Sequence, residues 1–163
     1  MKKMMKNRKG FTLMEMLIVV AIIAILVIIA IPTFNSALAK ARAATDVANI
    51  RSGYAAAQVD AMTEGLKDKD GKDTAEVTYT LQQDGSVKKG SDATNAKPYK
   101  CVGSSKNATK GTTIGGKVEV DTDTETSTTG KISWAKGATI TYKVTETDGV
   151  FSVEIASVAG KGN

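Results

Sequence analysis

One apolar stretch constrains this chain more than any other feature of its sequence. From Phe11 to Phe34 the only ionisable side chain is that of Glu15, and the ten residues before Phe11 carry five positive charges and no negative one. A basic flank followed by about twenty apolar residues is typical of a membrane-inserting segment whose N-terminus stays in the cytoplasm. A carboxylate is costly within hydrocarbon, so Glu15 is a functional-site candidate by default.

These residues resemble the N-terminus of the type IV pilin superfamily, which includes the pseudopilins. The resemblance rests on a basic leader ending in Gly10, on an unbroken aliphatic run, and on Phe11, Thr12, Leu13, Glu15, Leu17 and Pro32, so it covers about the first quarter of the chain. It implies that a prepilin peptidase cleaves between Gly10 and Phe11 and methylates the new N-terminus. N-methyl-Phe11 would then begin the mature subunit. Filaments of this family unwind the helix before such a proline, so unwinding near Ile28–Pro32 is expected.

Two other interpretations of this segment stay open at the level of sequence. Ala37 and Ala39 resemble the cleavage site of an ordinary secretory signal, which would place the mature start at Lys40. Against this, the apolar run exceeds the usual 7–15 residues or so, and Glu15 in its first turns would weaken such a signal. The third interpretation is a plain membrane-anchored domain.

Charge and composition exclude several classes of function. Of the 22 basic residues five lie before Gly10, which leaves 17 against 17 acidic residues, so the mature chain is nearly neutral. No specific nucleic-acid site is identifiable from such a balance. Because there is no histidine and Cys101 is the only cysteine, neither an intramolecular disulfide nor a zinc site of the usual kind can form. Many pilins of Gram-negative bacteria have such a disulfide, whereas the similarity to pilins of Gram-positive bacteria is unaffected. We expect Cys101 to be a buried small hydrophobe.

Four segments are expected along the chain, which together predict an α+β fold: a long N-terminal helix packed on an antiparallel β-sheet head. Residues 1–10 form the cleaved leader, 11–34 a transmembrane and filament-core helix, 35–64 its amphipathic half, and 65–163 the globular head. In the amphipathic half, apolar residues recur at steps of three and four and predict one packed stripe, formed by Val47, Ile50, Tyr54, Ala57, Ala61 and Met62. Five charged residues fall largely off it: Lys40, Arg42, Asp46, Arg51 and Asp60. Gly53 is the weak point of this helix, and Gly65 is its natural stop.

The head is expected to contain three strand pairs. Glu76–Leu81 and Ser86–Lys88 flank an Asp-Gly turn, and Lys131–Trp134 pairs with Lys117–Val120. The strongest hairpin joins Ala138–Thr145 to Val150–Ile155 through a second Asp-Gly, and its apolar face should pack on the stripe of the helix.

Three polar segments of the head are expected to be solvated and to carry no site. Lys67–Asp73 has lysines where an EF-hand has ligands, and Asn107–Thr109 matches a glycosylation sequon only weakly. Asp121–Thr129 is acidic and rich in threonine, so a bound cation or an O-linked sugar is the alternative to a solvated loop there.

No residues form a motif for catalysis, metal or cofactor binding, so we expect a non-enzymatic structural subunit. The resemblance implies a pilin that polymerises with itself for adhesion, surface motility or DNA uptake. Its other partners would be the membrane before assembly, the prepilin peptidase, and the assembly platform with its ATPase. The subunit would lie in the cytoplasmic membrane and then in a pilus on the cell surface. Pairing of Glu15 with the amine of Phe11 on a neighbour would set register in the filament. The alternatives are a pseudopilin of a type II secretion or competence machine and, more distantly, a membrane-anchored or secreted ligand-binding domain.

Overall fold

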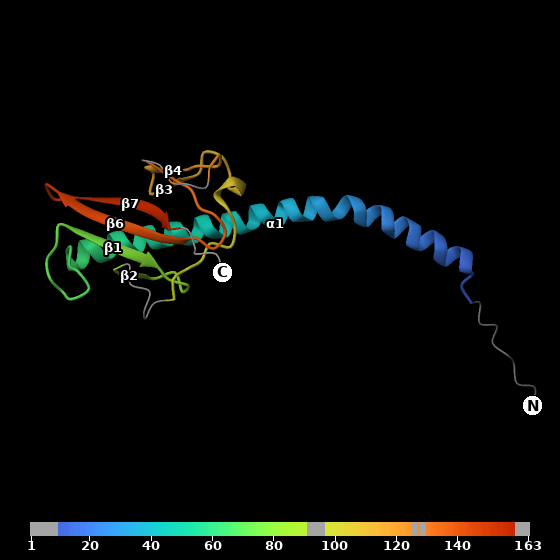
Figure 1. The fold of residues 1–163 in the computed structure, drawn as a ribbon, viewed down its shortest axis with the longest axis horizontal. Coiled ribbons are helices and arrows are strands. Elements are labelled where there is room, and N and C mark those ends of the chain that lie inside the picture. The colour runs from blue at the N-terminus through green and yellow to red at the C-terminus, as the bar shows by residue number, and fades with distance from the viewer. Residues whose placement is uncertain (1–9, 91–96, 125–126, 128–129, 159–163) are drawn as a thin grey trace, which may run out of the picture. The chain divides into compact units, whose positions relative to one another are not determined.

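A computed structural model of the chain describes residues 10–90, 97–124, 127 and 130–158. It consists of one long helix followed by short strands and confirms the α+β prediction (Figure 1). The elements are α1 (Leu13–Glu64), β1 (Glu76–Leu81), β2 (Val87–Lys89), a 3-10 helix (Ser105–Asn107), β3 (Thr113–Ile114), β4 (Val118–Val120), β5 (Lys131–Ile132), β6 (Thr139–Thr147) and β7 (Val150–Val158). Contacts divide the chain between Ala37 and Leu38, so the helical segment before this point and the head after it are described separately.

Helix α1 begins after Thr12 and ends where Gly65 adopts a positive φ of 72°, as the sequence predicted. It is continuous through Pro32, so the unwinding expected near this residue is not present in the single chain. Proline removes the donor for the carbonyl of Ile28. The Thr33 hydroxyl donates to the carbonyl of Ile29 at 3.2 Å and adds a bond within the same turn.

The segment before Leu38 has an unusual surface. Every described residue from Gly10 to Ala37 is exposed, although most of them are large and apolar. By length and composition, this helix is long and apolar enough to cross a membrane.

The head contains two sheets. The larger one has the order β2-β1-β6-β7 with every pair antiparallel, and the smaller one has the order β3-β4-β5. All three predicted strand pairs are present, but β4 and β5 run parallel, and β3 was not predicted. The antiparallel description therefore holds for the larger sheet only. Strand β5 ends at Ile132, two residues earlier than predicted, because Ser133 and Trp134 turn into the core instead.

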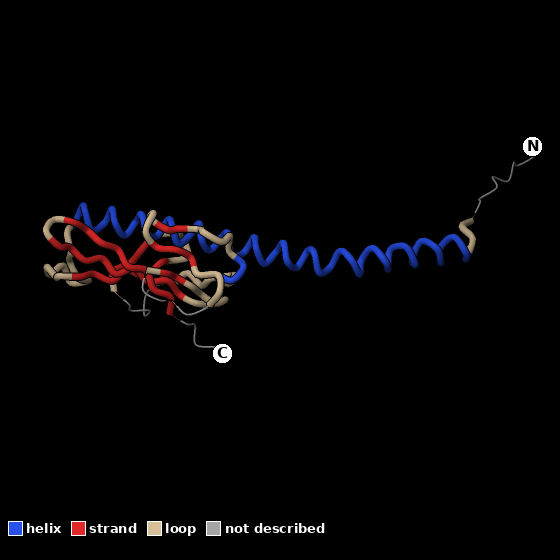
Figure 2. The backbone as a smooth tube through the Cα atoms, turned by 90° about the horizontal axis from the view of Figure 1, so that it is seen from above, coloured by secondary structure: helices blue, strands red, loops and turns tan. Residues whose placement is uncertain are grey.

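The core of the head lies between α1 and the larger sheet, and Figure 2 shows this part of the helix running along the strands. The β6–β7 hairpin packs on the helix as predicted: Ile140, Tyr142 and Val144 are fully buried, and the Tyr142 hydroxyl donates to the carbonyl of Ile50 at 2.9 Å. Of the predicted stripe, Val47, Ile50, Tyr54, Ala57 and Ala61 are buried. Met62 is not, because it lies on the far face of the last turn and is 69% exposed.

Gly53 is a point of close contact rather than a gap in the helix. A Cβ atom at this position would lie 2.4 Å from the Tyr142 hydroxyl and 2.7 Å from a methyl carbon of Leu81. The absence of a side chain lets the tyrosine ring lie against the helix backbone and reach the carbonyl of Ile50.

Candidate functional site

Three of the four residues that the sequence singled out for processing and assembly lie at the start of α1. Gly10 and Phe11 precede the helix, and the Phe11 side chain is 80% exposed. Nothing lies within 4 Å of the position that a Cβ atom of Gly10 would take. Among the described residues, nothing therefore crowds the peptide bond between Gly10 and Phe11. The leader residues 1–9 lie outside the described residues.

Glu15 caps the helix in this structure. Thr12 donates its backbone N–H and its hydroxyl to Oε2 of Glu15, both at 2.8 Å, and the N–H of Glu15 donates to the Thr12 hydroxyl at 3.2 Å. This reciprocal arrangement is a capping box, which satisfies backbone donors that the first helical turn leaves without partners. A negative charge in the first turn also interacts favourably with the helix dipole.

The sequence analysis missed this capping role, although its signal was present. Thr12 followed three residues later by Glu15, just before an apolar run, is the signature of a capping box. Within one chain, the Glu15 carboxylate thus already accepts hydrogen bonds from Thr12. A pairing with the amine of another subunit must either form alongside these hydrogen bonds or replace them.

The four residues named for processing and assembly do not form one cluster. Gly10, Phe11 and Glu15 lie together at the start of α1. Pro32 lies seventeen residues beyond Glu15 in the same helix, or roughly 25 Å at 1.5 Å per residue. It cannot contact the first turn of its own chain, so any joint role of these residues requires a second copy.

A second carboxylate of α1, that of Asp46, is fully buried in the head. Its Oδ1 accepts hydrogen bonds from the Tyr99 hydroxyl at 2.7 Å and from the Val102 N–H at 2.9 Å. Its Oδ2 accepts from the Gly103 N–H at 2.8 Å and from the Trp134 indole N–H at 3.1 Å. The expectation that Asp46 falls off the packed stripe was wrong, because four donors from distant segments replace the water that a carboxylate needs.

The Asp46 cluster joins α1 to the segment that follows β2. Gly103 packs directly on the helix, since a Cβ atom there would lie 2.7 Å from the backbone nitrogen of Ala43. No sequence pattern pointed to Asp46, because its donors are two backbone N–H groups and two side chains far away along the chain. We interpret this cluster as structural.

Cys101 lies beside this cluster and is buried, as predicted. Burial, and secondarily the charge of Asp46, raises the pKa of the Cys101 thiol well above its usual range. Burial and the hydrogen bond to Asp46 raise the pKa of Tyr99 in the same way. Both groups therefore stay protonated and neutral at physiological pH, which makes the thiol a poor nucleophile.

Two of the three solvated segments of the sequence analysis contain a turn that an aspartate closes. In Lys67–Asp73 the Asp68 carboxylate accepts the N–H groups of Asp70 and Lys72, both at 2.9 Å, and so closes a turn. Asp121 does the same for the N–H of Asp123 at 2.8 Å, although residues 125–126 and 128–129 of that loop lie outside the described residues. Among the residues that the structure describes, no group of three or more potential metal ligands is found.

Comparison with known families gives one match, at the N-terminus. Residues 5–31 match the family described as the prokaryotic N-terminal methylation motif. The matched range contains Gly10, Phe11 and Glu15 and stops just before Pro32. No solved structure matches the chain.

Proposed function

We propose that this chain, a prepilin of the type IV pilin and pseudopilin kind, is the major structural subunit of a type IV pilus that serves adhesion, surface motility or DNA uptake. The motif implies processing by a prepilin peptidase, and pilin-type proteins are structural rather than enzymatic. The observation that carries the proposal is the surface of α1: its most apolar part, Leu13–Ala37, is exposed along its whole length.

Two environments in turn would cover this surface. The helix satisfies its own backbone hydrogen bonds, so it is stable in hydrocarbon while the precursor is anchored in the cytoplasmic membrane. In a filament, the same side chains would leave lipid and pack against the corresponding helices of other copies. A head-to-tail contact of this kind does not close on itself and therefore propagates as a fibre.

Glu15 would set the register of that packing. After cleavage the amine of Phe11 carries a positive charge, and an apolar interface disfavours both this charge and the carboxylate unless they are paired. Within one chain Oε2 of Glu15 is held by Thr12, which fixes the orientation of the side chain in the first turn. A carboxylate fixed in this way presents a defined partner to the amine of a neighbouring subunit.

Mass spectrometry of the mature subunit tests the processing step. The expected N-terminus is N-methyl-Phe11, and Gly10→Val should block cleavage because the peptidase cleft admits only a small side chain at this position. Gly10→Ala is the matched control and should still be processed. A mature start at Lys40 would contradict the proposal and identify a secretory signal instead.

Electron microscopy of sheared surface material, labelled with an antibody to the head, tests the product. Long labelled filaments on the cell surface are expected. Labelled protein that is methylated but remains in the cell envelope would instead identify a pseudopilin of a secretion or competence machine. Labelled protein with neither methylation nor filaments would point to a membrane-anchored ligand-binding domain.

A further inference from the structure

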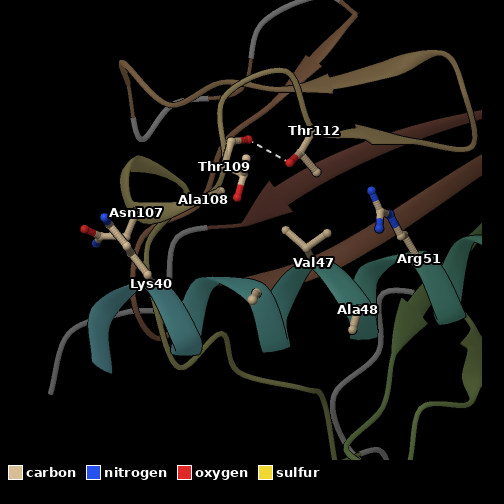
Figure 3. Close-up of a pocket in the computed structure, with 9 residues that line it drawn as sticks. Lys40, Val47, Ala48, Arg51, Asn107, Ala108, Thr109 and Thr112 are labelled. Carbon is tan, nitrogen blue, oxygen red and sulfur yellow. Dashed lines mark hydrogen bonds between the residues drawn. The ribbon is translucent and has the colours of Figure 1, made fainter. Parts of the chain in front are cut away.

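A groove in the head runs along α1 and has a volume of about 470 Å³ (Figure 3). Its floor is formed by the small apolar residues Ala44, Val47 and Ala48 of the helix. Lys40 and Arg51 stand at its two ends on the same helix. The opposite wall is formed by Asn107, the last residue of the 3-10 helix, and by Ala108, Thr109 and Thr112, which follow it.

Both charged residues that line this groove, Lys40 and Arg51, are positive. No carboxylate lines it, and Lys106 and Lys110 belong to the segment that forms its wall. Arg51 donates Nε and Nη2 to the carbonyl of Thr113, at 3.2 and 2.9 Å, which holds the guanidinium in place without neutralising it. In the part of the chain that the structure describes, neither Lys40 nor Arg51 forms a salt bridge. An apolar floor between two cations, one of them held in place, fits a short acidic segment that also carries an apolar side chain.

The turn between β6 and β7 is a segment of this kind, and we call residues 146–150 the hairpin tip. Glu146 pairs with Phe151 on one face of the hairpin, and Val150, which is 64% exposed, pairs with Thr147 on the other face, while Asp148 lies in the turn itself. Strand β1 pairs with β6 only as far as Thr145, so beyond that residue β6 and β7 are paired with each other alone. Asp148 and Gly149 both have positive φ, 52° and 77°, the geometry of a tight two-residue turn. The tip is therefore a rigid projection and not a loose loop.

The 3-10 helix, whose last residue Asn107 lines the groove, and the β6–β7 turn lie at opposite ends of the head (Figure 1). The start of β6 lies near the groove, since the N–H of Cys101 donates to the carbonyl of Ala138 and the wall segment follows a few residues later. The tip is at the other end of β6, a strand of nine residues that spans roughly 27 Å. The tip therefore cannot reach the groove of its own chain.

We propose that the hairpin tip of one copy docks in the groove of the next copy, with Val150 on the apolar floor, Asp148 toward Arg51, and Glu146, on the face turned away from the floor, paired with the long side chain of Lys40 at the end of the groove. This inference rests on the proposed function, because it supplies a second contact between polymerising subunits, one made by their heads. Two different surfaces at opposite ends of one domain give a heterologous contact, which repeats along a fibre instead of closing into a dimer.

Cross-linking in intact filaments tests the contact. A full-length chain with Thr147→Cys at the tip and Ala48→Cys on the groove floor should form a ladder of covalent multimers on oxidation, because each copy carries both partners. Thr147→Cys alone should give no ladder, and neither should Thr147→Cys with Gln83→Cys, which places the second thiol on an exposed turn outside the groove. Cys101 is buried and should not compete.

Each outcome of this experiment has one meaning. Normal filaments without a ladder would overturn the docking while leaving the pilus proposal intact. An unmodified chain that forms no filaments would refute the pilus proposal itself. A ladder that forms only when the filaments are treated with nuclease before oxidation would mean that nucleic acid occupies the groove, and would also overturn the docking.

A charge exchange decides the matter if the cysteine variants do not assemble. Glu146→Lys should lower filament number about fivefold, the effect of one surface ion pair on an equilibrium. Adding Lys40→Glu to the same chain should restore it, whereas Glu154→Lys, an exposed change on β7 away from the tip, should have no effect. Wild-type filament number in Glu146→Lys, or no recovery in the double variant, would overturn the docking.

Discussion

The two halves of α1 belong to one helix, but only the second half is covered by other parts of the same chain. Leu13–Ala37 is apolar all round and exposed, whereas the half within the head buries eight residues, most of them small. The more hydrophobic half is thus the one left uncovered. Burial is decided by whether the chain itself supplies a partner surface: the sheet of the head covers the second half, and among the described residues nothing covers the first.

A carboxylate from each half, Glu15 and Asp46, shows the same division in its surroundings. Asp46 receives four hydrogen bonds from its own head and needs nothing further. Glu15 receives two from Thr12 and remains exposed. In our interpretation the head is complete in one chain, and the first half of α1 is completed only by other copies.

Removing the first half of α1 should have the largest effect. A fragment that begins at Asn35 should be soluble and monomeric at micromolar concentration, because it lacks the apolar surface while keeping the core intact. Surface charge pairs alone hold subunits only weakly. Analytical ultracentrifugation measures this directly, with the full-length chain in detergent as the comparison. Strong polymerisation of the fragment would mean that the head, not the helix, drives assembly.

Glu15→Gln separates the capping role of this residue from its charge. Glutamine also completes a capping box, so the helix should begin at the same residue. The neighbour's amine would meet no counter-charge, so the equilibrium constant for adding a subunit should fall roughly 100-fold or more. Counts of filaments on cells that make normally processed protein give the result.

Thr12→Ala is the matched control for this change, since it removes the capping hydroxyl and keeps the carboxylate. It should reduce filament number far less than Glu15→Gln does. The reverse order would assign Glu15 to helix capping alone, and filaments at wild-type number in Glu15→Gln would refute the charge pairing.

Asp46→Ala should destabilise the head while leaving the first half of α1 unchanged. Four donors would lose their acceptor within the core, and the expected loss is about 3–5 kcal/mol in the free energy of unfolding. Trp134 is the only tryptophan and donates to Asp46, so urea unfolding of the fragment that begins at Asn35 can be followed by its fluorescence. Asp70→Ala, in an exposed turn, should change stability by less than about 0.5 kcal/mol. An equally small loss for Asp46→Ala would contradict its role in joining helix and head.

Gly53→Ala should have a smaller effect on the same measurement. Alanine is favoured over glycine within a helix by about 1 kcal/mol, but here its methyl group would overlap the Tyr142 hydroxyl. The overpacking should dominate, with a net loss of about 1–2 kcal/mol. Ser52→Ala, at the adjacent exposed position, serves as the control. A gain in stability from Gly53→Ala would mean that the sheet can move away from the helix at little cost.

Local patterns in the sequence predicted the features of this fold that depend on neighbouring residues. The helix end at Gly65, the Asp-Gly turn between β6 and β7, and the buried positions of the stripe are all set by conformational preference and spacing within a few residues. The capping box of Thr12 and Glu15 has the same kind of local signal, a threonine followed three residues later by a glutamate before an apolar run.

Features that depend on distant partners were not predictable in this way. By its position, Asp46 is a polar residue of an amphipathic helix, and its burial depends on donors 53 to 88 residues away. The parallel pairing of β4 with β5 likewise depends on the path of the chain between them, and the groove depends on a polar segment that packs on α1. Periodicity carries no information about such contacts.

The Asp46 cluster also has a consequence for how the head folds. Its donors come from Tyr99, the Val102–Gly103 backbone and Trp134, so long loops must close before the carboxylate loses its water. Contacts of such high sequence separation slow folding, since the entropy of loop closure is lost before the contacts form. The helix can form early by local bonds alone, but the head around it cannot be completed from its N-terminal side as the chain emerges. Until Trp134 has been synthesised, the core on which the buried face of α1 packs is incomplete. The side chains of this face must therefore remain in contact with water or with a chaperone.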